Sequence, residues 1–375
     1  MNILITGGAG FIGSRLALAL IAKGHAVRVL DTLSPQVHGA DPERSPLYTA
    51  IAGKVEFLRG DVADRATLEA AIADQQVVVH LAAETGTGQS MYQIERYTAV
   101  NIGATATLLD ILTNQPHSVT RVVVASSRSI YGEGKYLTPD GTAVYPAHRA
   151  EGDMLAGDFE VKAGGTGGLT LVATDEESRI HPSSVYGITK QVQEQLVMTV
   201  CPTIGVEGVA FRYQNVFGPG QSLSNPYTGI LSIFSNLIMA GKGLNIFEDG
   251  EESRDFVYVD DVVDATVLGV EHPAAANQVF NVGTGVPVSV NTVAATLARL
   301  LGASPDVTVS GNFRLGDIRH NFADMTKIER ALGFRCKHDF ESGIARFVEW
   351  AKGEGEQASD YEGSIAEMKA RGLMK

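Results

Sequence analysis

Short apolar runs alternate with segments of helical periodicity through the first half of the chain. The apolar runs, rich in Val, Ile and Leu as buried strands are, lie at 3–5, 26–30, 55–58, 77–81 and 121–125. The segments with helical spacing and few breakers lie at 11–22, 65–73 and 101–112. This alternation predicts right-handed βαβ units and a parallel sheet covered on both faces. We therefore expect a doubly wound α/β fold of the Rossmann type, with ligands at the carboxyl ends of the strands.

The alternation stops after Tyr131. Residues 132–180 contain turn residues, scattered charges and a glycine-rich run, which predicts an inserted loop or small hairpin module. Helical spacing resumes at about 183–200, and the remainder mixes helical segments with short strands. We expect a doubly wound domain and a second, smaller α/β domain, followed by a polar tail. The predicted divisions are 1–131 with 181–215 and 255–282, then 132–180, then 216–254 with 283–352, and finally 353–375.

Charge and composition exclude several classes of protein. The 375 residues carry 43 Asp and Glu against 30 Lys and Arg, a net charge of −13 that disfavours binding to nucleic acids or anionic membranes. Cys201 and Cys336 are too few for a disulfide framework or a four-cysteine metal site. No basic-then-apolar leader opens the sequence, and no stretch approaches the ~20 apolar residues that cross a bilayer. We expect a cytoplasmic protein with neither nucleic-acid nor membrane partners.

The sequence TGGAGFIG at 6–13 follows the first strand and opens the first helix. Gly7 permits a tight turn, Gly10 lets the backbone approach a pyrophosphate, and Gly13 lets helix and strand pack closely. The N-terminus of the helix, at Phe11 and Ile12, then offers unpaired N–H groups to phosphates. Glycines also mark plain turns, but the flanking strand and helix favour a dinucleotide site.

Two carboxylates at strand ends indicate which dinucleotide binds. Asp31 ends the second strand, where it can accept hydrogen bonds from both ribose hydroxyls of NAD and would repel a 2′-phosphate. NAD is therefore favoured over NADP, the alternative being a solvated loop aspartate. Asp61 and Val62 follow the third strand, where an adenine edge could be recognised, although Asp61 could equally cap a helix.

A catalytic set is suggested by Ser127, which ends the fifth strand, and by Tyr186 and Lys190 on the helix after the insertion. Tyr186 and Lys190 are one helical turn apart and share a face. A lysine ammonium beside a phenol lowers the tyrosine pKa and makes it a usable base. Ser127 would hold the substrate hydroxyl. Many helices contain Tyr-x-x-x-Lys by chance, so the prediction rests on its combination with the glycine-rich loop.

Seven motifs together resemble the extended short-chain dehydrogenase/reductases that act on nucleotide sugars. They are TGGAGFIG at 6–13, HLAA at 80–83, NIG at 101–103, SSRSIYG at 126–132, YGITK at 186–190, RYQNVFGP at 212–219 and RDFVYVDD at 254–261. The resemblance covers nearly the whole chain and implies a tightly held NAD, the Ser127, Tyr186 and Lys190 set, and a nucleoside-diphosphate sugar as substrate. It also implies cofactor contacts from Leu81, Ala82, Ala83 and Tyr213.

The motif around Ser127 separates two reactions of that family. Relatives that eliminate water carry Asp-Glu directly after the catalytic hydroxyl residue, whereas this chain has Arg128 and Ser129. The acid and base that dehydration needs are therefore missing. A 4-epimerase needs neither, because hydride leaves C4, the 4-keto sugar turns over, and hydride returns to the opposite face. We expect an isomerase of this kind.

The long polar segment between Ser127 and Tyr186 resembles that of bacterial dTDP-L-rhamnose 4-epimerases, which make dTDP-6-deoxy-L-talose. Some relatives carry cysteine pairs there that suggest a zinc ribbon. This segment has no cysteine, and His148 and His181 alone cannot make a site, so we expect no metal.

Further contacts follow from the resemblance. It places Asn215, Arg254 and Arg314 around the diphosphate and Thr87 in the sugar pocket. The alternatives are a surface ion pair for each arginine and a turn cap for Asn215. It also implies a homodimer in which the helix after Asn101 and the helix of Tyr186 form a four-helix bundle with their copies. Apolar residues at Ile188, Val192 and Leu196 fit such a seam, but packing within one subunit would give the same pattern.

Other functions stay open. Within the same class, the substrate could be UDP-glucose, UDP-N-acetylglucosamine or another nucleotide sugar, or the enzyme could be a 2-epimerase. A non-catalytic NAD-binding scaffold is disfavoured by the intact Ser127, Tyr186 and Lys190 set. An NADP reductase is disfavoured by Asp31.

Overall fold

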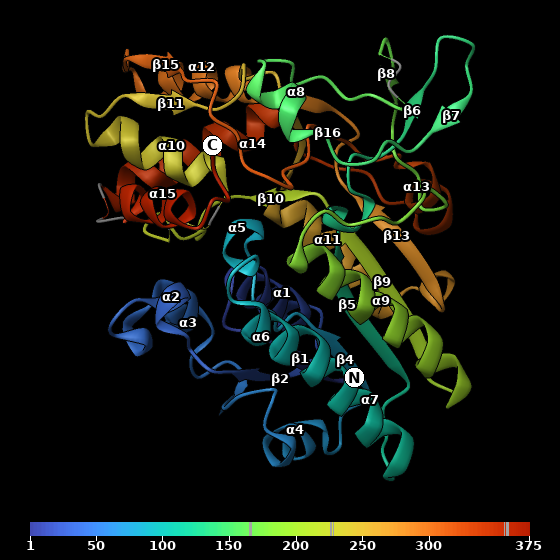
Figure 1. Ribbon diagram of the computed structural model, residues 1–375. Coiled ribbons are helices and arrows are strands. Elements are labelled where there is room, and N and C mark those ends of the chain that lie inside the picture. The colour runs from blue at the N-terminus through green and yellow to red at the C-terminus, as the bar shows by residue number, and fades with distance from the viewer. Residues whose placement is uncertain (165–166, 226, 228, 356, 358–359) are drawn as a thin grey trace.

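A seven-stranded parallel sheet forms the centre of the N-terminal unit in the computed structural model, which describes residues 1–164, 167–225, 227, 229–355, 357 and 360–375 (Figure 1). Its order is β13-β9-β5-β4-β1-β2-β3, so the chain starts at the middle and builds outward in both directions. The strands are β1 Asn2–Thr6, β2 Ala26–Asp31, β3 Glu56–Arg59, β4 Val77–His80, β5 Arg121–Ser127, β9 Glu207–Tyr213 and β13 Gln278–Val282. The predicted doubly wound fold is confirmed.

Alternation along the strands explains why helices cover both faces of this sheet. Ile3 and Ile5 of β1 belong to one hydrophobic cluster and Leu4 to another, because successive strand side chains point to opposite faces. The first cluster includes residues of α1 Phe11–Ala22 and α11 Val259–Glu271. The second includes residues of α4 Arg65–Ile72, α7 Ala104–Asn114 and α9 Val185–Thr203. Helix α9, which carries Tyr186, is tied to β9 by the buried ion pair of Arg212 with Glu194, whose atoms approach to 2.6 Å.

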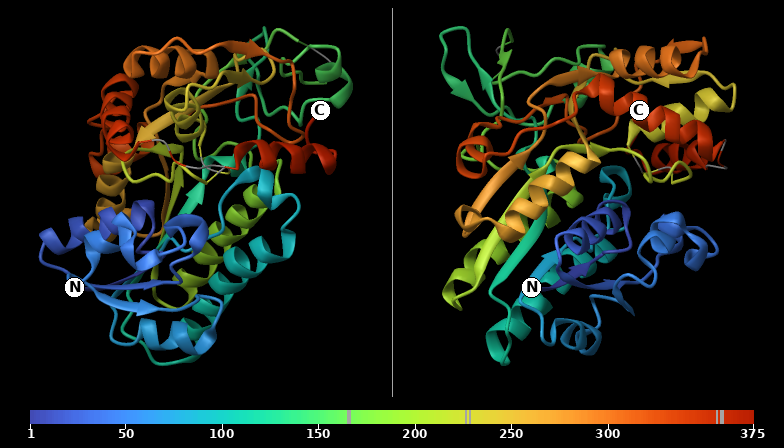
Figure 2. Two further views of the ribbon diagram at one scale, coloured as in Figure 1. Left: turned by 90° about the vertical axis from the view of Figure 1, so that its left-hand side faces the viewer. Right: turned by 180° about the vertical axis from the view of Figure 1, so that it is seen from behind.

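The second unit lies beyond the carboxyl ends of the sheet strands (Figure 2). Its four short strands are β10 Asn215–Phe217, β12 Ser253–Tyr258, β14 Pro287–Ser289 and β16 His320–Asn321, and a separate pair is β11 Leu244–Ile246 with β15 Val307–Val309. The helices α10 Ile230–Met239, α12 Val290–Leu301 and α14 Phe340–Glu354 pack on them around Phe217 and Phe347. Buried Asp255 joins this unit internally, because its carboxylate accepts hydrogen bonds from the backbone of Thr284, Gly285 and Ala323. The residue boundaries between the two units stay a prediction.

The segment predicted as an insertion forms a small module at the edge of the second unit (Figure 1). It contains a three-stranded antiparallel sheet, β6 Tyr136–Leu137, β7 Ala143–Val144 and β8 Thr170–Leu171, and the helix α8 Glu151–Leu155. Met154 and Phe159 pack on Phe313 of the second unit. Part of the glycine-rich run of this segment, residues 165–166, lies outside the described residues.

Several short elements were not visible as periodic patterns. They are α2 Pro35–His38, α3 Pro46–Ile51, α5 Thr87–Ser90, α6 Ile94–Tyr97 and α13 Thr326–Leu332, the 3-10 turns Pro42–Arg44, Arg128–Tyr131 and Pro273–Ala275, and a π-helical turn Thr98–Gly103 before α7. Each is too short for a hydrophobic period to repeat. The predicted polar tail contains the helix α15 Tyr361–Ala370. No helix among the described residues is long and apolar enough to cross a membrane.

Candidate active site

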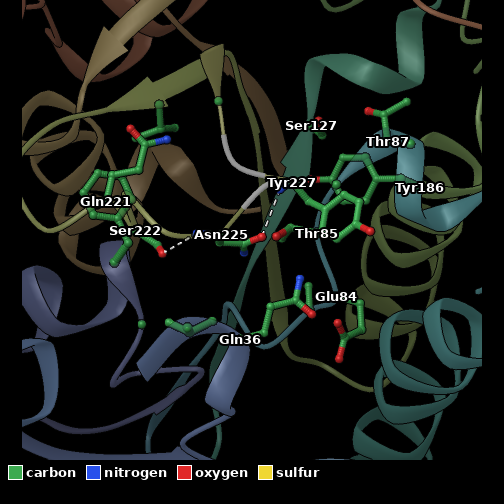
Figure 3. A pocket seen from close by; sticks show the side chains of 18 of the residues that line it. Gln36, Glu84, Thr85, Thr87, Ser127, Tyr186, Gln221, Ser222, Asn225 and Tyr227 are labelled. Atoms are coloured by element: carbon green, nitrogen blue, oxygen red, sulfur yellow. Dashed lines mark hydrogen bonds between the residues drawn. The ribbon is translucent and has the colours of Figure 1, made fainter. Parts of the chain in front are cut away.

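A cavity of about 1010 Å³ lies between the two units, at the carboxyl ends of the sheet strands. Figure 3 shows Thr87, Ser127 and Tyr186 at one end of this cavity. All residues predicted as catalytic, cofactor-binding or substrate-binding line it: Gly7, Gly10, Phe11, Ile12, Gly13, Asp31, Asp61, Val62, Leu81, Ala82, Ala83, Thr87, Ser127, Tyr186, Lys190, Tyr213, Asn215, Arg254 and Arg314. The structure thus brings these residues together, while their individual roles stay predictions.

The glycine-rich loop leaves room for a ligand because side chains are excluded from it. Gly7 has a φ of +69°, which favours glycine, and its N–H donates to the carbonyl of Leu30. A Cβ on Gly13 would lie 2.4 Å from the carbonyl oxygen of Gly7, so α1 could not pack so closely on the loop with any other residue there. Helix α1 then begins at Phe11 with its N-terminus at the cavity. This cradle fits a dinucleotide phosphate.

The two strand-end carboxylates are held differently. Asp31 accepts the Ala9 N–H at one oxygen (3.0 Å) and the Leu33 N–H at the other (2.8 Å), which fixes its carboxylate at the cavity wall. Asp61 accepts the Ala63 N–H at 2.8 Å, as a local turn cap does. The fixed position of Asp31 suits recognition of a ribose.

Tyr213 lines the same cavity from the end of β9 but turns its hydroxyl away, toward Thr266 of α11 at 2.6 Å. The face of its ring, rather than its hydroxyl, is therefore the part that a cofactor could contact.

Ser127 is oriented by the residue two positions later. Its Oγ accepts hydrogen bonds from the backbone N–H of Ser129 (3.2 Å) and from the Ser129 hydroxyl (2.9 Å). With both bonds accepted, the hydrogen of the Ser127 hydroxyl remains available to the cavity. Ser129 therefore acts as an orienting donor in the position where dehydratases carry glutamate.

Tyr186 stands at the start of α9, where Ser184 caps the helix and the Tyr186 N–H donates to Ser90 of α5 at 3.0 Å. Burial raises the pKa of its phenol, and the Ser127 hydroxyl and the Arg128 guanidinium each act in the opposite direction. The cationic influence on Tyr186 in this structure thus comes from Arg128, which the sequence singled out only as a departure from dehydratases.

Lys190 is almost completely buried, with 3% of its surface exposed. Its ammonium donates to the carbonyl of Ala125 at the end of β5 (3.0 Å) and to the side-chain oxygen of Gln193 (2.9 Å). Burial lowers the pKa of Lys190 to about 7. Two of its three N–H groups are therefore held by the protein, and one remains for a ligand.

Arginines form another part of the cavity lining. Arg254 donates to the carbonyls of Ser253 and Arg319 and to Asp317 at 3.1 Å. Arg314 lies over the Phe247 ring, 5.4 Å from its centroid, and 3.6 Å from Asp317. Burial acts to raise the pKa of Asp317, but the neighbouring arginines outweigh it and lower the pKa to about 2. This edge of the cavity is suited to an anion.

Behind these arginines lies a buried ionic cluster, defined here as Glu133, Arg149, Glu248 and Arg319. Arg149 contacts Glu248 at 2.7 Å and Glu133 at 3.4 Å, and Arg319 contacts Glu248 at 3.0 Å. All four side chains are at most 5% exposed. Because Glu133 and Arg149 belong to the insertion, the cluster fastens that module to the wall of the cavity.

The C-terminal helix α15 was not predicted to reach the site. Tyr361, Ile365 and Met368 line the cavity, and Glu367 accepts hydrogen bonds from Tyr92 (3.1 Å) and Tyr227 (3.3 Å). The three lining residues recur at i, i+4 and i+7, which is the signal of a buried helix face. That signal was visible in the sequence, but nothing there indicated what the face contacts.

Among the residues that the structure describes, no group of three or more His, Cys, Asp or Glu side chains could hold a metal ion. His148 and His181 stack with ring centroids 6.5 Å apart, and one nitrogen of His181 bonds to the carbonyl of Pro146.

Known proteins of similar sequence and structure include nucleotide-sugar epimerases. The dTDP-L-rhamnose 4-epimerase of Burkholderia thailandensis is 37% identical over 352 residues, which cover 93% of this chain and 94% of that protein. The crystal structure of UDP-glucose 4-epimerase with UDP-glucose from Thermotoga maritima has a TM-score of 0.76 at 29% identity, covering 94% of this chain and 99% of that one. The UDP-glucose 4-epimerase of Thermus thermophilus, solved with NAD, has a TM-score of 0.73 at 28% identity and covers 94% and 99%.

The family profile described as "NAD dependent epimerase/dehydratase family" matches residues 3–153 and 164–283. The match contains the glycine-rich loop, Ser127, Tyr186 and Lys190, and its one internal gap falls within the insertion. The resemblance found in the sequence is confirmed, and with it NAD as the cofactor. The chain belongs to the NAD-dependent epimerase/dehydratase family.

Proposed function

We propose that this protein is a nucleotide-sugar 4-epimerase that interconverts dTDP-L-rhamnose and dTDP-6-deoxy-L-talose. The observation that carries the proposal is the arrangement of Ser127, Tyr186 and Lys190 on one wall of a cavity that is lined by a glycine-rich loop and by arginines. The similarity to the Burkholderia thailandensis protein over 93% of the chain supports this choice of substrate.

The cofactor would be held by residues on the side of the seven-stranded sheet. Gly7, Gly10 and Gly13 with the N-terminus of α1 would hold its diphosphate, and Asp31 would accept hydrogen bonds from the adenosine ribose. Further contacts would come from Phe11, Ile12, Asp61, Val62, Leu81, Ala82, Ala83, Tyr186, Lys190 and Tyr213. NAD held there would supply the acceptor and donor of the hydride at C4 of the sugar.

The protein side chains would manage the proton of that step. Ser127, oriented by Ser129, donates its free hydrogen bond to the sugar hydroxyl, and Tyr186 takes the hydroxyl proton as C4 is oxidised. Lys190 offers its third N–H beside Tyr186. When hydride returns to the other face, Tyr186 gives the proton back. Hydride and proton are both restored, so the reaction has no net oxidant or reductant.

The substrate would be held by both units while the sugar turns over. Arg254 and Arg314 would bind the diphosphate, and Asn215, whose buried side-chain oxygen accepts no hydrogen bond in the protein, would contact it as well. Thr87 would contact the sugar close to Tyr186 (Figure 3).

Dehydration is disfavoured because Arg128 and Ser129 occupy the two positions where its acid and base are expected. Arg128 cannot donate and accept a proton as a carboxyl group does, and the Ser129 hydroxyl is bonded to Ser127. A 4-epimerase of UDP-glucose or UDP-N-acetylglucosamine is the second candidate, favoured by the similarity to two UDP-glucose 4-epimerase structures.

Incubation of the purified protein with dTDP-L-rhamnose, followed by NMR of the sugar, tests the proposal. We expect an equilibrium mixture with the C4 epimer and no change in NADH absorbance. Parallel reactions with UDP-glucose and UDP-N-acetylglucosamine distinguish the second candidate. Loss of water or accumulation of NADH would contradict epimerisation.

We also propose a homodimer formed through α7 and α9. Ile188 on α9 is 47% exposed in the single chain, although it is a large apolar residue, which supports a covered position in an assembly. Analytical ultracentrifugation of the wild type and of Ile188→Glu tests this, since the charge should shift the protein toward monomer. The cytoplasmic location stays a prediction from the sequence.

A further inference from the structure

A network of polar side chains lies buried behind Lys190 and connects it to the glycine-rich loop. The Lys190 ammonium donates to the Gln193 Oε1 at 2.9 Å, and the Gln193 Nε2 donates to the Thr105 Oγ1 at 2.9 Å. One ring nitrogen of His80 lies 3.1 Å from the Thr105 Oγ1 and the other lies 2.8 Å from the Thr6 Oγ1. We call Thr6, His80, Thr105 and Gln193 the neutral network; each is at most 1% exposed.

The direction of each hydrogen bond in the neutral network is fixed by one residue. The Thr105 hydroxyl donates its single hydrogen to the carbonyl of Asn101 at 2.6 Å. Its oxygen can then only accept, so Gln193 must present its NH₂ group to Thr105 and its oxygen to Lys190. By the same argument His80 donates from Nε2 and accepts the Thr6 hydroxyl at Nδ1. The amide of Gln193 therefore has one orientation.

This orientation matters because lysine is a flexible side chain with three donors. The Ala125 carbonyl and the Gln193 oxygen take two N–H groups of Lys190, and the remaining one is left for the cavity that Lys190 lines. A leucine at position 193 would fill similar space without burying an amide, which is unfavourable unless it is hydrogen-bonded. The buried amide is therefore explained by its bond to Lys190.

We propose that Gln193 is a positioning residue, whose side-chain oxygen, oriented by Thr105, fixes the Lys190 ammonium so that one N–H points to the reacting groups. This inference rests on the proposed function only for the identity of the group that the third N–H of Lys190 contacts. In the sequence, Gln193 follows Lys190 by three positions, so the motif extends to Tyr-x-x-x-Lys-x-x-Gln. Residues three apart share a helix face, which lets Gln193 reach Lys190.

The titratable groups His80 and Glu194 do not take the place of Gln193 as hydrogen-bond acceptors of Lys190. His80 on β4 stays neutral, since burial and the charge of Lys190 lower the pKa of His80 to about 3. Glu194 on the same helix is engaged with Arg212 of β9 in a two-pronged ion pair at 2.6 and 3.0 Å. Tyr186 lies one turn earlier on α9 and is the group that Lys190 would assist.

A first experiment reads Lys190 directly in the full-length protein as purified with NAD. Lysine side chains are labelled with ¹⁵N at Nζ, the Lys190 signal is assigned with Lys190→Met, and it is titrated with pH in the wild type, Gln193→Leu and Gln193→Glu. We expect Lys190 to titrate at lower pH in Gln193→Leu, which loses an acceptor, and at higher pH in Gln193→Glu. An unchanged titration in both variants would overturn the proposal, whether or not the protein proves to be an epimerase.

A second experiment measures epimerisation. Gln193→Leu should lower kcat by about 10- to 100-fold with KM changed less than about twofold. The matched control is Gln75→Leu, a buried glutamine 4% exposed that bonds to the carbonyl of Ala73. Equal kcat in Gln193→Leu and the wild type would overturn the proposal. If Gln193→Leu does not fold, Thr105→Val is measured in its place. Without the Thr105 hydroxyl the Gln193 amide is no longer held in one orientation, so kcat should fall by about 3- to 10-fold. A kcat equal to that of the wild type would overturn the proposal.

Discussion

Two buried polar networks flank the cavity and differ in how complete they are. In the neutral network every side-chain nitrogen and oxygen named above has a hydrogen-bond partner. In the ionic cluster, the Nε atoms of Arg149 and Arg319 are buried and make no hydrogen bond, and the same holds for Nη1 of Arg128 and Nε of Arg314 nearer the cavity. The neutral network thus has its hydrogen bonds without a ligand, whereas the ionic side leaves buried arginine nitrogens without a hydrogen bond.

This difference suggests that the neutral network and the ionic side have different functions, which we call the division between the two sides. The neutral side holds Lys190 in place and should set the rate of the chemical step. On the ionic side, Arg128, Arg254 and Arg314 all lower the pKa of the Asp317 carboxyl group, and arginine side chains are suited to the diphosphate of a nucleotide sugar. That side should set substrate affinity and stability. Each of the following experiments tests the division.

Tyr186→Phe should have the largest effect and should act on kcat alone. Removal of the phenol hydroxyl takes away the proton acceptor, so we expect kcat to fall by about 10³-fold while the protein stays folded and retains NAD. Steady-state epimerisation and the NAD content of the purified protein measure this. The control is Tyr48→Phe, because Tyr48 packs on Phe57, 4.9 Å between ring centroids, away from Tyr186. Retained turnover would place the base elsewhere.

Arg319→Met should destabilise the fold strongly. Arg319 is fully buried and its loss leaves the buried Glu248 and the nearby Asp249 with less compensation, at a cost of about 3–5 kcal/mol in the free energy of unfolding. Denaturant unfolding measures it. Arg299→Met is the matched control, since Arg299 and Glu341 form an ion pair with both side chains more than half exposed, and we expect less than about 1 kcal/mol. Similar losses in both variants would mean that the ionic cluster contributes no more than a surface pair.

Arg314→Met should raise KM by about 10- to 100-fold and leave kcat nearly unchanged, because it removes a contact made equally before and during the reaction. Arg335→Met, at an 82% exposed side chain, serves as the control. If kcat fell as much as kcat/KM, the ionic side would take part in the chemical step and the division between the two sides would fail.

The two networks also differ in how far the sequence reveals them. Tyr186 and Lys190 share one helix and the glycine-rich loop joins one strand to one helix, so local periodicity and spacing predicted them. Gln193 lies on the same helix, but no pattern in the sequence singled it out. The ionic cluster joins residues 133, 149, 248 and 319, whose proximity depends on how the insertion folds and docks. For α15 the apolar face was visible, but its place over the cavity depends on contacts with Tyr92 and Tyr227 that no local pattern encodes.

A smaller effect should appear in the pH dependence of stability between pH 5 and pH 7, to which the two sides contribute with opposite signs. Burial raises the pKa of Glu252 to about 7; its Oε2 accepts no hydrogen bond and lies 3.8 Å from Arg319. Burial likewise raises the pKa of Glu133 to about 7. Burial lowers the pKa of His80 from 6.5 to about 3, so below about pH 6.5 the fold lacks a proton that the unfolded chain binds, and stability rises with pH there.

The sign of the effect follows from proton binding. Between about pH 4.5, where the carboxyl group of Glu252 titrates in the unfolded chain, and about pH 7, the folded protein keeps a proton that the unfolded chain has lost. The contribution of Glu252 to stability is therefore fully present below pH 4.5 and is lost as the pH rises to about 7. Glu252→Gln should reduce the stability difference between pH 5 and pH 8 by on the order of 1 kcal/mol, with exposed Glu251→Gln as the control and denaturant unfolding as the measurement. Because Glu133 remains, part of the loss of stability with rising pH should survive in Glu252→Gln and be removed in the double variant with Glu133→Gln. His80 acts in the opposite direction and is unchanged in all of these proteins. A double variant that kept the full loss would place its titrating groups outside the ionic side, and the contrast between two networks of opposite pH dependence would have to be given up.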